Sequence, residues 1–129
     1  MSIEIGIERL AALVLLLTCL SHVTAPVAWT ALFERIRKSD APGLATAAIH
    51  LPLGLLLVAF HNVWRWPGMV FTIIGWALLL KGSAHLLFPK IAKLSLGLPG
   101  IGEQAVRRYR LAGAIMAPLA LLLCWLAFT

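Results

Sequence analysis

The sequence predicts an all-α membrane protein in which four transmembrane helices form two tandem helical hairpins, related by a pseudo-two-fold axis along the membrane normal. The 129 residues are 61% hydrophobic and only 12% charged, with a mean hydropathy of +0.95. Soluble domains are typically about 45–50% apolar and about 25% charged. The apolar residues also form four long tracts, and two short sequence patterns occur once in each half of the chain.

The four tracts have the length of membrane-spanning helices. An α-helix needs about 20 residues to cross roughly 30 Å of hydrocarbon. Backbone groups inside a bilayer must bond within the protein, and the alternating pattern of a barrel strand is missing, so we expect helices. We find no separate domain and assign residues 1–129 to a single transmembrane domain. The expected spans are Leu10–Phe33, Leu44–Trp64, Pro67–Phe88 and Leu111–Phe128.

Basic residues in the connections predict the orientation. Eight of them lie in the first and third connections: Arg35, Arg37, Lys38, Lys90, Lys93, Arg107, Arg108 and Arg110. The other side has only Arg9 and Arg65. Because cytoplasmic loops carry the excess of Lys and Arg, we expect both termini to be periplasmic. These basic residues also explain the net charge of +6, because they set the topology and contact anionic lipid headgroups. The expected partner is therefore the lipid bilayer and not a nucleic acid.

The second and third connections differ in character. The second is a short turn in which Trp64 and Trp66 are expected to anchor the outer interface, with His61 beside them as a polar cap or as the mouth of a site. The third runs over residues 90–106 and begins as an amphipathic continuation of the third helix. Glycine and proline at Gly97 and Pro99 then break it.

The repeated patterns indicate an internal duplication. The tract Leu15–Pro26 begins with three consecutive leucines, followed by His22 and the final proline, and residues 78–89 repeat the same spacing with His85 and Pro89. A second tract, residues 48–57, recurs at residues 114–123. The repeats cover about residues 5–64 and 67–128. Because each repeat contains two spans, the chain returns to its starting side after the first repeat, and both halves enter the membrane in the same direction.

Three histidines inside the spans are the main candidates for binding. Polar side chains in the membrane are costly and usually face a bundle interior or cavity. Under the duplication, His22 matches His85, and His50 matches Met116. Together with Lys81, which precedes His85 by one helical turn, these residues are the predicted ligand-binding set.

The same histidines predict a metal site in a more specific hypothesis. Cys19 lies three residues before His22 on one helix face. Thiolate and imidazole ligands suit copper or zinc, which gives the set Cys19, His22, His50 and His85. A haem held between His22 and His85 is a further alternative. The simpler interpretation is that the histidines only form hydrogen bonds between helices.

Three prolines are expected to shape the bundle. Pro26, Pro52 and Pro118 lack an N–H and so free the carbonyl four residues earlier in a helix. Kinked helices with free carbonyls line cavities in transporters, although prolines are also common in membrane helices for no special purpose.

One stretch resembles a known group of proteins. The tract from His61-Asn62-Val63-Trp64 through Gly75-Trp76-Ala77-Leu78-Leu79-Leu80-Lys81-Gly82 and Phe88-Pro89 is similar to uncharacterised small four-helix integral membrane proteins of bacteria. The resemblance covers about a quarter of the chain. It implies a bacterial inner membrane and supplies no activity.

The predicted function is a small polytopic inner-membrane protein that binds or translocates a small solute or ion through a His-lined bundle interior. Four spans bury little interior, so we expect a homo-oligomer. The alternative is a non-catalytic accessory or assembly subunit of a larger membrane complex. An enzyme is less favoured, because the chain has no nucleotide-binding loop, HExxH or CxxC motif and keeps its five acidic residues outside the spans.

Overall fold

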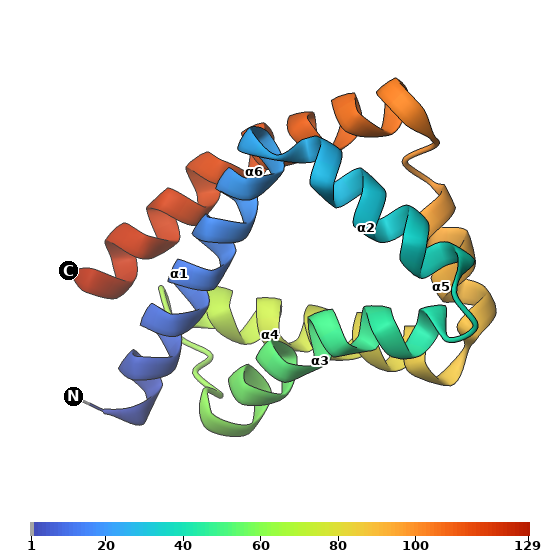
Figure 1. The fold of residues 1–129 in the computed structure, drawn as a ribbon. Coiled ribbons are helices and arrows are strands. Elements are labelled where there is room, and N and C mark those ends of the chain that lie inside the picture. The colour runs from blue at the N-terminus through green and yellow to red at the C-terminus, as the bar shows by residue number, and fades with distance from the viewer. Residues whose placement is uncertain (1) are drawn as a thin grey trace.

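The computed structural model describes residues 2–129, and within that range the secondary structure is entirely helical (Figure 1). Helices α3, α4 and α6 are each long and apolar enough to cross a membrane, and α1 and α2 meet the same criterion as one bent pair. The chain therefore has three to four candidate spans. The helices are α1 (Ile3–Thr24), α2 (Pro26–Lys38), α3 (Pro42–Phe60), α4 (Met69–Leu87), α5 (Pro89–Gly97) and α6 (Gly102–Phe128).

The first predicted span, Leu10–Phe33, is broken. Helix α1 ends at Thr24, and α2 leaves it at an angle of 101°. Pro26 has no N–H to donate to the carbonyl of His22, and its fixed φ suits the first residue of a new helix. The prediction of a continuous helix over this tract is therefore wrong, because the chain turns sharply before Pro26.

The second half of the chain contains a similar break. Helix α4 ends at Leu87, and Pro89 begins α5. A turn with Gly100 at a φ of 84° then leads into α6. Glycine adopts this left-handed conformation without the steric cost that a Cβ would bring. The segment after α4 is thus helical and ends at the predicted Gly97, but it is a separate helix and not the expected continuation of the third helix, and α6 begins well before the predicted Leu111.

The most extensive contacts between helices do not follow the expected tandem hairpins. Helix α3 packs mainly on α4, and α1 packs mainly on α6, as the paired ribbons show (Figure 1). Tandem hairpins would instead have made α1 the main partner of α3, and α4 the main partner of α6. The two proline breaks explain the difference, since α2 and α5 carry the chain sideways before the next long helix begins.

Glycines allow the paired helices to approach closely. A Cβ added to Gly54 on α3 would lie 2.7 Å from the backbone nitrogen of Leu79 on α4. A Cβ added to Gly113 on α6 would lie 2.6 Å from the carbonyl oxygen of Cys19 on α1. Side chains at these positions would force the helices apart, as is common for small residues at membrane helix interfaces.

The apolar core lies at the end of the molecule that holds both termini (Figure 1). Arg9 stabilises this end, because its Nε donates to the Ala127 carbonyl oxygen at 3.0 Å and its guanidinium lies 4.9 Å from the centre of the Phe128 ring. Helices α2 and α5 close the opposite end. The core residues are Ala11, Ala12, Leu57, Phe71, Leu123 and Ala127.

The contact at Gly54 predicts a large effect of a single methyl group. We expect Gly54→Ala to lower the free energy of unfolding by about 1–3 kcal/mol, because overpacking an interface displaces its backbone. Gly97→Ala is the matched control, since a Cβ there meets nothing within 4 Å. Equilibrium unfolding in detergent micelles measures both, and an equal response of the two variants would contradict the close contact.

Candidate functional site

A cavity of about 270 Å³ lies where the six helices meet, at the end away from the apolar core. Its wall combines polar and cationic side chains with aromatic rings, and no acidic residue contributes to it. Because residues from the whole length of the chain converge here, the cavity exists only in the assembled bundle. The residues used below are His22 of α1, Trp29 and Phe33 of α2, His50 of α3, Lys81 and His85 of α4, Ser95 of α5 and Tyr109 of α6.

Four of the five predicted ligand-binding residues line this cavity. They are His22, His50, Lys81 and His85. The fifth, Met116, lies instead beside a smaller neighbouring pocket of about 110 Å³, together with Cys19 and again His22. The structure therefore brings together the three intramembrane histidines and the lysine, and leaves the methionine and the cysteine to one side.

Two of the histidines have their ring orientation set by their own helix. The Nδ1 atom of His22 lies 2.8 Å from the Thr18 carbonyl oxygen, and the Nδ1 atom of His50 lies 2.8 Å from the Thr46 carbonyl oxygen. A carbonyl oxygen only accepts, so Nδ1 carries the proton in both rings. The donor on Nδ1 is thus already used in each case, and Nε2 is the atom left for a ligand.

An aromatic wall covers one side of the cavity. The Trp29 ring stacks on His22 with 4.3 Å between centroids, and its Nε1–H donates to Ser21 Oγ at 2.9 Å. Phe33 stacks on Tyr109 at 5.4 Å. The sequence analysis missed these rings. The spacing of four residues from Trp29 to Phe33 could have placed both on one helix face, whereas nothing in the sequence links Tyr109 to them.

His85 differs from the other two histidines because its Nδ1 atom has no hydrogen-bond partner. It is the one buried side-chain nitrogen or oxygen without a partner in residues 2–129. The residue is only 4% exposed, and its ring lies 6.0 Å from the ring of His50. Leaving a buried polar atom unpaired costs about 1–3 kcal/mol. A buried polar atom without a partner needs an explanation, and a bound ion that supplies the partner is one.

Lys81 lies one turn before His85 on the same helix and also reaches the cavity. The ion pairs found in the described part of the chain involve Glu34 with Arg37 and Lys38, and Glu8 with His61, but not Lys81. A cation without an anionic partner therefore stands beside an imidazole without a hydrogen-bond partner.

The predicted metal site is not assembled. Across residues 2–129, no group of three or more His, Cys, Asp or Glu side chains is placed to hold a metal ion. Cys19 belongs to the neighbouring pocket and not to the lining that the three histidines share. Only the rings of His50 and His85 are adjacent. The geometry gives no support for copper, zinc or haem as the cofactor.

The predicted structural prolines lie in two kinds of place. Pro26 is the first residue of α2 and is buried, so it shapes the bend beside the cavity. Pro52 and Pro118 lie inside α3 and α6, which continue through them as helices. Both of these prolines are exposed and lie outside the lining of the cavity.

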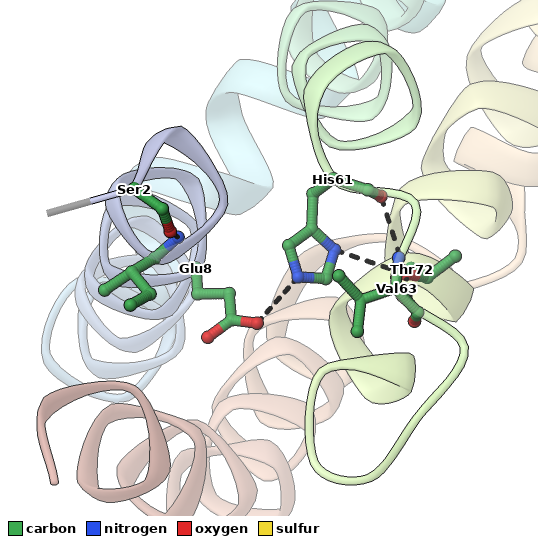
Figure 2. A network of polar contacts seen from close by, with 6 residues as sticks. Ser2, Glu8, His61, Val63 and Thr72 are labelled. Atoms are coloured by element: carbon green, nitrogen blue, oxygen red, sulfur yellow. Dashed lines mark hydrogen bonds and ion pairs between the residues drawn. The ribbon is translucent and has the colours of Figure 1, made fainter.

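A second polar cluster lies at the opposite end, next to the apolar core (Figure 2). The Nε2–H of His61 donates to Glu8 Oε1 at 2.6 Å, and Thr72 Oγ1 lies 3.2 Å from the Nδ1 atom of the same ring. The Thr72 hydroxyl also donates to the Val63 carbonyl oxygen at 2.8 Å and accepts from the Val63 N–H at 3.1 Å. The cluster links three segments, which are α1, the loop that follows α3, and helix α4.

This cluster corrects the expectation for His61. The side chain is fully buried, so it is not an interfacial polar cap. No sequence pattern connects Glu8 or Thr72 with His61, which lies 53 residues after Glu8 in the chain. Within the described chain, both ring nitrogens of His61 have partners, so the cluster ties helices together and is not a second binding site.

Comparison of the chain with protein-family models, with curated proteins and with solved structures gives no match.

The Thr72 hydroxyl gives a direct test of the buried cluster. We expect Thr72→Val to lower the free energy of unfolding by about 1–3 kcal/mol, because it leaves the Val63 N–H and the buried imidazole unsatisfied. Thr24→Val is the control, since it removes an exposed hydroxyl and should change the value by less than about 0.5 kcal/mol. Unfolding curves in the same detergent measure both, and a neutral Thr72→Val would contradict the network.

Proposed function

We propose that this protein is a multi-pass membrane protein that binds a small solute in the six-helix cavity. The observation that carries the proposal is the convergence of His22, His50, Lys81 and His85 on one cavity of about 270 Å³. Ligand pockets of proteins usually measure about 300–1,000 Å³, so the solute is small. Intramembrane ionisable groups that face a cavity commonly mark solute or ion pathways.

The two ends of the molecule support access from one side. The cavity lies at the end formed by α2 and α5, whereas the apolar core and the Glu8–His61 hydrogen bond lie at the other end. A solute would enter from the α2–α5 end. Translocation of the solute would in addition require the core end to open.

We further propose a bacterial inner-membrane location with both termini in the periplasm. The support is the distribution of basic residues, which gather on the last turn of α2, on α5 and on the first turns of α6. The cavity would then face the cytoplasm.

The internal duplication belongs to the same proposal. Each half contains a long helix, a shorter helix that begins with proline, and a long helix with an internal proline. The pair α1 with α6 corresponds under the duplication to the pair α4 with α3, which are the two largest contacts. Superposition of residues 5–64 on residues 67–128 tests the relation, and a best fit that does not place Pro26 near Pro89 contradicts it.

The topology is tested with reporter fusions. Alkaline phosphatase fused after Thr129 should be active, because it folds only in the periplasm, and green fluorescent protein at the same position should stay dark. Fusions in the loop after Ser39 should give the opposite result. Fluorescence from the Thr129 fusion would place the terminus in the cytoplasm and contradict the proposed orientation.

The binding function is tested by filling the cavity. We expect Ser95→Trp to abolish the rise in melting temperature that a bound solute causes, because its indole occupies the space. The control is Leu94→Trp, whose side chain is exposed and outside the cavity lining. The panel contains benzoate, benzamide, phosphate, glycerol and ethylammonium.

Two outcomes decide between the candidate functions. A solute that stabilises the natural protein and Leu94→Trp, but not Ser95→Trp, supports binding in the cavity. If no solute acts on any form, the binding function fails. Co-purification of a stoichiometric partner in that case would favour the accessory subunit. The expected homo-oligomer is measured by mass photometry on the same samples.

A further inference from the structure

The charge of the cavity is one-sided. Lys81 brings a positive charge, and no acidic side chain lies in the lining to balance it. The acids of the described ion pairs are committed elsewhere, since Glu34 pairs with Arg37 and Lys38, and Glu8 pairs with His61. Lys81 is an exposed residue that also lines the cavity, and its ammonium group attracts a group of opposite sign. A ligand that complements the charge of the lining is therefore an anion.

The free hydrogen-bonding capacity is equally specific. The Nδ1 donors of His22 and His50 are used by backbone carbonyls. In contrast, the Nδ1 atom of His85 is buried and unpartnered, and His85 follows Lys81 by one helical turn on the same face of α4. An oxyanion has several lone pairs and can accept from an ammonium group and an imidazole N–H together.

Resting on the proposed function, we propose that the solute is an oxyanion joined to a small apolar body. Its carboxylate or phosphate oxygens accept from Lys81 Nζ and the His85 imidazole, and its apolar part packs on the aromatic wall. Trp29, Phe33 and Tyr109 form that wall on the side given by α2 and α6. The cavity thus selects the anion by charge and the body by shape.

The same chemistry occurs in two sources. One is a soluble organic acid from the aqueous phase. The other is the phosphate of an anionic lipid, because the cavity lies at the end where α2 and α5 carry basic residues, the usual level of lipid headgroups. The test therefore has a soluble arm and a lipid arm.

The soluble arm compares benzoate with benzamide, which have nearly the same shape and differ in charge. We expect benzoate to bind the full-length protein in a neutral detergent by isothermal titration calorimetry, and benzamide to bind at least tenfold more weakly. Lys81→Met should weaken benzoate binding by about tenfold or more, because it removes a charge-assisted hydrogen bond. Lys81→Arg should keep the affinity within about threefold.

The control for charge is Lys93→Met, which removes an exposed lysine on α5 that is outside the cavity lining. It should leave benzoate binding unchanged. His85→Phe removes the imidazole donor but keeps a ring of similar size, and its fold is checked by its melting temperature without ligand. Weaker benzoate binding in a folded His85→Phe supports the assigned donor.

The lipid arm uses native mass spectrometry of protein taken from nanodiscs of phosphatidylglycerol or of phosphatidylcholine. If the source is a lipid headgroup, one phosphatidylglycerol molecule stays bound to the natural protein and to Lys93→Met, is lost in Lys81→Met, and is displaced by benzoate. If the source is a soluble acid, benzoate binds equally well to protein from both nanodiscs and no lipid is retained.

Three results overturn the inference: equal binding of benzoate and benzamide, equal behaviour of Lys81→Met and Lys93→Met, or binding of neither benzoate nor anionic lipid. The last result separates this inference from the proposed function. If ethylammonium or glycerol still gives stabilisation that Ser95→Trp abolishes, the cavity binds a solute of another class and only the anion is wrong. If nothing binds, both proposals are wrong.

Discussion

Two helix breaks organise this molecule. Helix α1 ends at Thr24 and α4 ends at Leu87, and Pro26 and Pro89, whose fixed φ suits the first residue of a helix, each begin a new helix after the break. The short helices α2 and α5 then run across the end of the bundle before α3 and α6 begin. The pairing of α1 with α6 and of α3 with α4 follows from this detour. The six-helix cavity also follows from it, since α2 and α5 supply one of its walls.

The two ends of the bundle contain different types of side chain. At one end, small and aromatic apolar residues pack closely and a buried histidine has partners for both nitrogens. At the other end, wide aromatic rings and polar groups leave a cavity. Small residues permit close packing in a membrane, whereas bulky rings at a helix bend hold helices apart. Stability and binding are thereby separated along the length of the same helices.

The sequence predicted the helical class, three of the spans and four of the cavity residues, because each depends on local patterns such as apolar length and intramembrane histidines. Which helices pack against one another could not be predicted from such local patterns. The repeat argument matched His50 with Met116, but in the structure Met116 lies beside His22 at the neighbouring pocket, because the close contact at Gly113 packs α6 against α1. The partners of His61 were missed for the same reason, since Glu8 and Thr72 come from different helices.

The pairing of the first helix with the last has a consequence for biosynthesis. Helices α3 and α4 are neighbours in the chain and can pack as soon as both have entered the bilayer. Helix α1 is made before α3 and α4, whereas its main partner α6 is made after them, so the α1–α6 contact at Gly113 can close only once α6 has been synthesised. Contacts between segments that are distant in the sequence form more slowly than local ones. A nascent chain that stops before α6 therefore holds the α3–α4 pair, to which α1 is joined only through the smaller contact around Glu8 and His61.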